Sequence, residues 1–204
     1  MTVAPFPYRI VFARHGETAY NAEGRLQGQR DTPLNARGRD QAAALGRTLR
    51  RRLAPEIERL EAADAFHASP LERARETMEI LRGAMGLDRG RYRLDPALME
   101  LSFGAWEGLT WEELEGRDAK AVRARRADKW TYAPPGGESY SMLAERLARW
   151  LTTVAGDLFV VAHGGTARGL MVLLAGVPPD AAADAPIRQG SALIFDKGRC
   201  RWLD

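Results

Sequence analysis

Short apolar runs alternate along the chain with longer segments in which apolar residues recur at helical spacing. The apolar runs predict strands at residues 8–13, 65–68, 91–94, 158–162, 191–195 and 200–203. The longer segments predict helices at residues 36–53, 71–85, 110–115, 117–129, 139–154 and 166–175. Because strands and helices alternate, we expect an α/β fold, a three-layer αβα sandwich with a mostly parallel central sheet.

Two regions of the sequence indicate how the sheet is built. The run Phe159-Val160-Val161-Ala162 is apolar without interruption, as is typical of a parallel strand buried on both faces. Only residues 196–199 separate the last two strands, which predicts an antiparallel hairpin that ends in an edge strand. The sequence shows no internal repeat and no long linker, so we expect residues 1–204 to form a single domain.

Polar residues follow four of the predicted strands. Arg14 and His15 come after the first strand, and the helix that follows the second strand carries Arg73. Glu100 comes after the third strand and His163 after the fourth. In open α/β sheets, ligands bind outside the carboxyl ends of the strands. We therefore expect two arginines, two histidines and one carboxyl group on a single rim, a combination that can hold a phosphoryl group.

The composition narrows the classes of partner. The 204 residues include 45% hydrophobic and 28% charged residues, with a formal net charge of +3, which fits a globular protein. The arginines are interleaved with Glu and Asp rather than gathered in one basic stripe, so we expect no nucleic-acid partner. No apolar stretch approaches the ~20 residues of a membrane span, and residues 1–7 lack the features of a signal peptide. The sequence therefore predicts a cytoplasmic protein without a membrane partner.

Metal-ligating residues are scarce. The chain has one cysteine and three histidines, which does not favour a structural zinc site. We expect neither a metal nor another cofactor.

A series of short motifs begins where the first strand ends. In order, they are Arg14-His15-Gly16-Glu17-Thr18, Asn21, Arg25-Leu26-Gln27-Gly28, Asp31-Thr32-Pro33-Leu34, Gly38, Ser69-Pro70-Leu71-Glu72-Arg73-Ala74, Glu100-Leu101-Ser102-Phe103-Gly104, Pro135-Gly136-Gly137-Glu138-Ser139 and His163-Gly164. With these motifs the chain resembles the histidine phosphatase superfamily, the phosphoglycerate-mutase-like proteins, over residues 9–195. The resemblance implies a phosphoglycerate-mutase-like fold and a metal-independent transfer of a phosphoryl group.

The residues at the strand ends take expected roles from this resemblance and from the chemistry of phosphoryl transfer. His15 is expected to be the nucleophile, and the family implies a phosphohistidine intermediate at this position. Arg14 and Arg73 suit the phosphoryl oxygens because a guanidinium donates parallel hydrogen bonds and stays charged. His163 is expected to act as a protonated donor to the same group, and Gly164 beside it allows close backbone approach.

The remaining site candidates are carboxyl groups and amides. Glu100 is expected to be the general acid and base, favoured by family alignment over its rival Glu107. Glu17 is a third carboxyl candidate, for which we expect a structural role in the loop. Asn21 and Gln27 resemble the polar phosphate-binding positions of the phosphatase branch, although each could also be an ordinary loop amide.

Residues 103–109 resemble the phosphatase branch, which includes broad-specificity phosphatases and alpha-ribazole phosphatase. We therefore expect a phosphomonoester hydrolase that acts on a small phosphorylated metabolite. Three alternatives stay open: a cofactor-dependent phosphoglycerate mutase, a non-catalytic module that binds phosphorylated ligands or partner proteins, and a phosphatase acting on phosphohistidine in proteins. The sequence leaves the oligomeric state open, with a dimer among the options.

An insertion rich in aromatic residues lies between Glu100 and the later motifs. We expect residues 105–138 to form a helical, lid-like insertion. Its aromatic residues and their neighbours could line the mouth of a substrate pocket, favouring a partly apolar leaving group, or could pack beneath the lid. They are Phe103, Trp106, Trp111, Trp130 and Tyr132.

Overall fold

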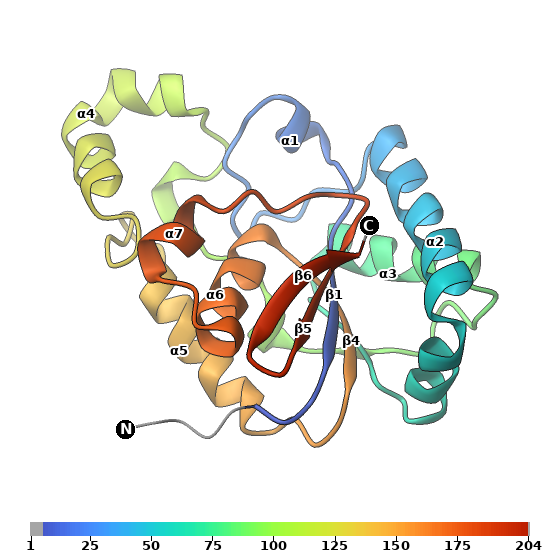
Figure 1. Ribbon diagram of the computed structural model, residues 1–204. Coiled ribbons are helices and arrows are strands. Elements are labelled where there is room, and N and C mark those ends of the chain that lie inside the picture. The colour runs from blue at the N-terminus through green and yellow to red at the C-terminus, as the bar shows by residue number, and fades with distance from the viewer. Residues whose placement is uncertain (1–5, 204) are drawn as a thin grey trace.

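The computed structural model describes residues 6–203 (Figure 1). Residues 1–5 lie outside this range. They make up most of residues 1–7, where the sequence predicts no signal peptide. Within it, six strands form one sheet in the order β3-β2-β4-β1-β5-β6. The strands are β1 (Ile10–Arg14), β2 (Phe66–Ala68), β3 (Arg93–Leu94), β4 (Leu158–Ala162), β5 (Ala192–Asp196) and β6 (Arg199–Leu203).

The sheet is mostly parallel, as predicted. β1 and β2 both pair with β4 in parallel, and β3 pairs with β2 in parallel. β5 is antiparallel to β1, and β6 is antiparallel to β5. The β5–β6 turn places Lys197 at φ 49° and Gly198 at φ 74°, the two positive φ angles that a tight hairpin of this hand requires. The predicted antiparallel hairpin is thus confirmed, and it forms one edge of the sheet.

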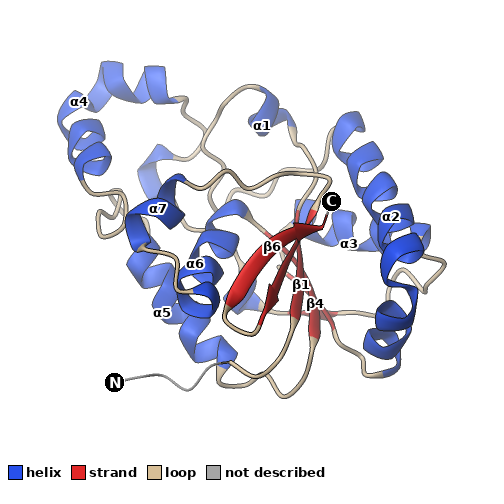
Figure 2. Ribbon diagram, viewed as in Figure 1, coloured by secondary structure: helices blue, strands red, loops and turns tan. Residues whose placement is uncertain are grey.

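Helices cover both faces of the sheet, which confirms the three-layer sandwich (Figure 2). On one face, α2 (Ala36–Ala62) packs against α3 (Glu72–Ala84). On the other, α5 (Tyr140–Leu151) packs against α6 (Gly164–Ala175), and α7 (Pro179–Asp184) contacts α6. Helix α4 (Trp111–Ala127) lies beyond the sheet, at the same end as the short helix α1 (Ala19–Ala22) (Figure 1). Two 3₁₀ helices, η1 (Pro96–Leu98) and η2 (Gly104–Trp106), complete the connections.

Two kinks agree with the predicted helix ends. The helix expected at 36–53 ends at the non-helical residue Leu53 (φ −127°, ψ 24°), and a further helical segment that was not predicted carries α2 through Pro55 to Ala62. The two helices expected at 110–115 and 117–129 likewise meet at a kink, the non-helical residue Asp118 within α4.

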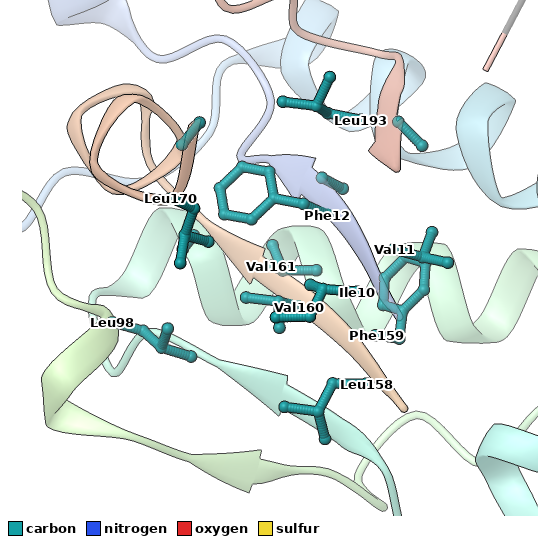
Figure 3. Close-up of a cluster of buried hydrophobic side chains, with 14 of the residues drawn as sticks. Ile10, Val11, Phe12, Leu98, Leu158, Phe159, Val160, Val161, Leu170 and Leu193 are labelled. Carbon is teal, nitrogen blue, oxygen red and sulfur yellow. The ribbon is translucent and has the colours of Figure 1, made fainter. Parts of the chain in front are cut away.

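The core is centred on the two inner strands of the sheet. Ile10, Phe12, Val160 and Val161 are buried, and Figure 3 shows them packed with Leu170 of α6. Strands buried on both faces need apolar side chains at every position, which explains the uninterrupted apolar runs of β1 and β4. Truncating a buried phenylalanine of such a strand to alanine typically costs about 3–5 kcal/mol.

Strand register brings the predicted site residues together. Arg14 at the end of β1 pairs with Ala162 at the end of β4, and the His15 amide donates to the Ala162 carbonyl at 2.9 Å. His15 and His163 therefore leave neighbouring strands at the same level. None of the helices in residues 6–203 is long and apolar enough to cross a membrane.

Candidate active site

The hydrogen bonding of His15 leaves one ring nitrogen for chemistry. Nδ1 lies 2.7 Å from the Gly16 carbonyl oxygen, so Nδ1 carries the proton and Nε2 keeps its lone pair. The Gly16 amide donates to the Thr77 hydroxyl at 3.0 Å, which fixes the turn. A Cβ at position 16 would collide with the Gly38 carbonyl, so only glycine fits between the nucleophile candidate and α2.

The His15 ring is held neutral by its surroundings. Burial lowers the pKa of His15 well below the ordinary value of 6.5, and the charges of Arg73 and Arg14 lower it further. The hydrogen bond to the Gly16 carbonyl acts in the opposite direction and is the smallest of these effects. Burial is thus a larger cause of the low pKa than either arginine.

Arg14 and Arg73 both line a cavity of about 170 Å³ that His15 also lines. Nη1 of Arg14 donates to the Ile187 carbonyl at 2.9 Å, and Arg73 donates to the carbonyls of Gly28 and Arg30 at 2.7 and 2.8 Å. These backbone contacts fix both guanidiniums. Their Nε atoms are buried and have no partner among the described residues, so each has a donor left for an anion. Burial lowers the pKa of both groups, while Glu100 raises it.

The structure separates the two leading carboxyl candidates. Glu100 lines the cavity, and its carboxylate accepts from the Leu101 and Gly165 amides at 2.8 and 3.1 Å. Glu107 does not line the cavity. It accepts from the amides of Gln29 and Phe103 at 2.9 and 3.1 Å, which holds two loops together.

Glu17 is not among the residues that line the cavity. One carboxylate oxygen accepts from the Asn35 amide group at 2.9 Å, and the other forms an ion pair with Arg37 at 3.3 Å. These contacts join the loop after β1 to the start of α2, and fit the structural role that we expect for Glu17.

His163 is fully buried beside His15 and does not itself line the cavity. The two ring centroids are 5.2 Å apart. Nε2 of His163 lies 2.7 Å from the Ser69 hydroxyl oxygen, whereas Nδ1 is buried and has no partner among the described residues. Burial lowers the pKa of His163 well below its ordinary value, and Arg73 adds to this. The protein's own groups therefore favour a neutral His163, whereas the sequence predicts a protonated one. A phosphoryl dianion beside the ring would raise the pKa of His163.

The other predicted phosphate-binding residues also line the cavity: Asn21, Gln27 and Gly164. The Gln27 side-chain oxygen accepts from the hydroxyls of Thr18 and Thr32 at 2.9 and 2.8 Å, which leaves its NH₂ group as the donor. The Asn21 side-chain oxygen accepts from Gln189 at 3.0 Å, so its NH₂ group is likewise left.

Several cavity residues have no counterpart in the sequence prediction. Arg168, Tyr140 and Gly165 line the cavity, and Ser69 holds His163. Arg168 could have been found, since it lies four residues after Gly164 on a helix and therefore on the same face. Tyr140 directly follows the motif Pro135-Gly136-Gly137-Glu138-Ser139 as the first residue of α5, but nothing in that motif assigns its side chain to the cavity.

The aromatic residues of the insertion divide into two groups. Phe103 lines the cavity, and Trp111 lines a neighbouring one. Trp106 stacks on Tyr132, with 5.8 Å between ring centroids, and belongs to a small apolar cluster with Leu114. Phe103 also packs against this cluster, so it lies both at the cavity and in the packing of the insertion. Contact of these residues with a substrate stays a prediction.

The third histidine, His67, lies within β2 and is level with Val160 in the middle of β4. It borders a cavity of about 470 Å³ near the start of β4 that contains none of the site residues. Within residues 6–203, no group of three or more His, Cys, Asp or Glu side chains is arranged to hold a metal ion.

The sheet order, the two strand-end histidines and the two arginines at the cavity are the arrangement that the resemblance to the histidine phosphatase superfamily implies. The sequence model of the histidine phosphatase superfamily (branch 1) matches residues 10–203, and the chain belongs to this superfamily. It is an enzyme of that superfamily, with relatives among both phosphatases and mutases.

Two sequence relatives illustrate this range. Glucosyl-3-phosphoglycerate phosphatase from Mycolicibacterium vanbaalenii is 37% identical over 186 residues, which cover 84% of this chain and 76% of the relative. The 2,3-bisphosphoglycerate-dependent phosphoglycerate mutase of Methylobacterium radiotolerans is 32% identical over 195 residues, covering 91% of this chain and 88% of the mutase.

Solved structures resemble the chain over nearly its whole length. Alpha-ribazole phosphatase from Shigella flexneri superposes with a TM-score of 0.77 at 27% identity, covering 96% of this chain and 94% of that one. A mycobacterial glucosyl-3-phosphoglycerate phosphatase in complex with VO₃ has a TM-score of 0.75 at 31% identity, covering 96% of both chains. The predicted fold and the phosphatase-branch resemblance are confirmed.

Proposed function

We propose that the chain hydrolyses small phosphomonoesters through a phosphohistidine formed on Nε2 of His15, with Glu100 as general acid and base. The observation that carries the proposal is the state of His15. Its Nδ1 donates to Gly16, its ring is neutral, and it borders a cavity together with Arg14, Arg73 and Glu100. A binding module needs neither a nucleophile nor an acid, so this arrangement favours turnover over the non-catalytic alternative.

In the first step, the Nε2 lone pair of His15 attacks phosphorus and the bond from phosphorus to the ester oxygen breaks. Glu100, protonated, gives its proton to the leaving oxygen, and the leaving group departs as an alcohol. The free Nε donors of Arg14 and Arg73 hydrogen-bond the equatorial oxygens. Because these donors are already fixed by backbone carbonyls, they need little reorganisation as charge develops.

In the second step, the Glu100 carboxylate takes a proton from water. The water oxygen attacks phosphorus, the bond between phosphorus and Nε2 breaks, and inorganic phosphate leaves. His15 returns to the neutral ring and Glu100 to the carboxylic acid, so the cycle closes. The two amides that hold Glu100 keep its carboxylate at the cavity wall in both steps.

A mutase would share the first step and transfer the phosphoryl group to a second metabolite. Residues 103–109 favour hydrolysis over mutase activity, because they resemble the phosphatase branch. They fold into the compact turn around η2. The relatives carry both kinds of name. Assay of 3-phosphoglycerate with and without 2,3-bisphosphoglycerate separates the two: a phosphatase releases phosphate, and a mutase forms 2-phosphoglycerate.

The direct test is hydrolysis of p-nitrophenyl phosphate in excess chelator. A labelled phosphoenzyme is then trapped, and the stability of its label is measured in acid and in base. We expect multiple turnovers and a base-stable, acid-labile label, as a phosphoramidate bond requires. His15→Ala should lose both the label and the turnover. A folded protein that releases no phosphate from a broad panel of esters would exclude hydrolysis, and a label retained in His15→Ala would exclude the nucleophile.

A further inference from the structure

The loop that carries Glu100 has no regular secondary structure of its own. Residues 99–103 lie between the 3₁₀ helices η1 and η2 and belong to no helix or strand. The backbone amides and carbonyls of such a loop must find their hydrogen-bond partners elsewhere in the protein. The position of the proposed acid therefore depends on the side chains that supply these partners.

Arg146 of helix α5 holds the backbone immediately before Glu100. Its Nη1 donates to the carbonyls of Ala97 and Met99 at 2.7 and 3.0 Å. The Met99 carbonyl belongs to the peptide unit that ends at the Glu100 nitrogen, and a peptide unit is planar and rigid. One arginine thus fixes the peptide plane on the amino side of the acid.

Gln29 holds the peptide unit on the other side of the acid. Its Nε2 donates to the Glu100 carbonyl at 3.1 Å, and the Leu101 amide of the same peptide unit donates to the Glu100 carboxylate at 2.8 Å. Both peptide planes that flank the Glu100 Cα are therefore held, and with them the direction in which the side chain leaves the backbone. In this direction the carboxylate meets the Gly165 amide at 3.1 Å and borders the cavity.

Glu138 holds Arg146 in the orientation that these contacts need. Nη2 of Arg146 lies 3.3 and 3.0 Å from the two carboxylate oxygens of Glu138. The two side chains are 20% and 22% exposed, and an ion pair this accessible adds little to stability. The pair instead restricts rotation of the guanidinium, so that Nη1 stays directed at the two carbonyls before Glu100.

The motif Pro135-Gly136-Gly137-Glu138-Ser139 lies directly against the same loop. The Ser102 amide donates to the Glu138 carboxylate at 3.0 Å, and the Glu138 amide donates to the Ser102 carbonyl at 2.8 Å. A Cβ at Gly137 would collide with the Ser102 carbonyl, so glycine is needed for this approach. The motif therefore holds the loop just after the acid, while Arg146 holds it just before.

We propose that Arg146, oriented by Glu138, is a positioning residue for the general acid Glu100. Neither Arg146 nor Glu138 is among the described residues that line the cavity with His15, so both act through the backbone of the loop. The inference rests on the proposed role of Glu100 in hydrolysis. A misplacement of about 1 Å can cost about 10²-fold in rate, so a loosened loop should impair proton transfer to the leaving oxygen.

The test compares kcat/KM of Arg146→Gln for phosphomonoesters with good and poor leaving groups. This parameter reports the steps up to release of the leaving group, which are the steps that need the acid. We expect a loss of about tenfold to hundredfold for alkyl phosphates and of less than about threefold for p-nitrophenyl phosphate. Arg146→Lys keeps the charge but not the planar group, and its losses should fall between those of wild type and Arg146→Gln. Equal losses for all esters would overturn the proposal, because a smaller folded fraction lowers every rate alike.

Arg91→Gln is the matched control. Arg91 forms ion pairs with Glu61 and Asp64 at 3.5 and 2.7 Å and is not among the described residues that line the cavity. The ratio of kcat/KM between alkyl and aryl esters should therefore stay that of wild type. If Arg146→Gln does not fold, Gln29→Ala releases the other peptide plane and should give the same dependence on leaving group. Equal losses for all esters in Gln29→Ala would then contradict the proposal.

A double-mutant cycle with Glu100→Gln separates a positioning role from a structural one. Once the acid is absent its position no longer matters, so adding Arg146→Gln should cost less than about threefold in kcat/KM for alkyl phosphates. Multiplicative losses in the double variant would reject positioning. If Glu100→Gln itself shows equal losses for good and poor leaving groups, Glu100 is not the acid and both proposals fall. If Glu100→Gln shows the dependence and Arg146→Gln does not, the proposed function stands and the positioning role alone is overturned.

Discussion

Nε2 of His163 lies 2.7 Å from the hydroxyl oxygen of Ser69, a residue 94 positions earlier in the chain. The Leu71 amide donates to the same hydroxyl oxygen at 3.3 Å. The hydroxyl keeps one proton and one lone pair, so the direction of its bond to Nε2 follows the tautomer of His163. We infer the tautomer with the proton on Nδ1, the buried atom that has no partner among the described residues, because Nδ1 can then donate to a phosphoryl oxygen.

This relationship predicts that Ser69→Ala lowers kcat by about fivefold to tenfold, because the tautomer of His163 is no longer fixed. The change in KM should be smaller than the change in kcat. Ser69→Thr keeps the hydroxyl and is the matched control, with activity closer to wild type. Thermal unfolding of both variants shows whether the buried packing survives. Wild-type kcat in a folded Ser69→Ala variant would show that Ser69 does not position His163.

The carboxyl assignment predicts a contrast between Glu100→Gln and Glu107→Gln. Without its acid, Glu100→Gln should lose about 10²–10⁴-fold in kcat, with the larger loss for esters of poor leaving groups, since these need the proton. Glu107 accepts from backbone amides of two loops, so Glu107→Gln should lower the unfolding temperature without changing the dependence on leaving group. Rates across a series of aryl and alkyl phosphates measure that dependence. Equal losses for good and poor leaving groups in Glu100→Gln would argue against Glu100 as the acid.

The two buried histidines predict a loss of stability in acid. Each has a folded-state pKa well below its ordinary value of 6.5 because burial disfavours the charged ring. Above about pH 6.5, the rings are neutral in both the folded and the unfolded state, and stability is fully retained. As the pH falls from 6.5 towards the folded-state pKa values, the unfolded chain binds more protons, and each histidine lowers the free energy of unfolding by up to about 1.4 kcal/mol per pH unit.

Denaturant unfolding between pH 5 and pH 8 measures this slope. The His15→Gln/His163→Gln variant should show a flatter dependence than wild type below pH 6.5, since neither glutamine titrates. His67→Gln is the control, because the pKa of this less buried histidine is lowered to a smaller extent. An identical slope in the double variant and wild type would mean that these rings are already protonated in the folded protein.

The sequence predicted the inner sheet better than its surroundings. β4 occupies residues 158–162 as expected, because a strand buried on both faces is apolar throughout. In β3 only Arg93 and Leu94 are paired, and both are exposed, so little in its pattern defines its ends. Helix α1 is too short, at four residues, to show a helical period. Similarly, the motif favours Glu100 over Glu107 as the general acid, but it gives no physical reason for the choice. The physical difference lies in the backbone amides from which each carboxylate accepts, and these depend on the folded loops.

Gly165 of helix α6 allows the close approach of Glu100, the acid of the proposed reaction. A Cβ at this position would collide with the Glu100 carboxylate, which accepts from the Gly165 amide at 3.1 Å. Gly165→Ala should therefore displace Glu100 and lower kcat by at least tenfold, even though alanine is favoured by about 0.5–1 kcal/mol over glycine within a helix. Gly116→Ala in α4 is the matched control: nothing lies within 4 Å of its Cβ, so activity should be retained. Because displacement of the acid acts on proton transfer, the loss in Gly165→Ala should grow as the leaving group becomes poorer. A Gly165→Ala enzyme with wild-type kcat would show that Glu100 can move away from α6 without loss of its chemistry.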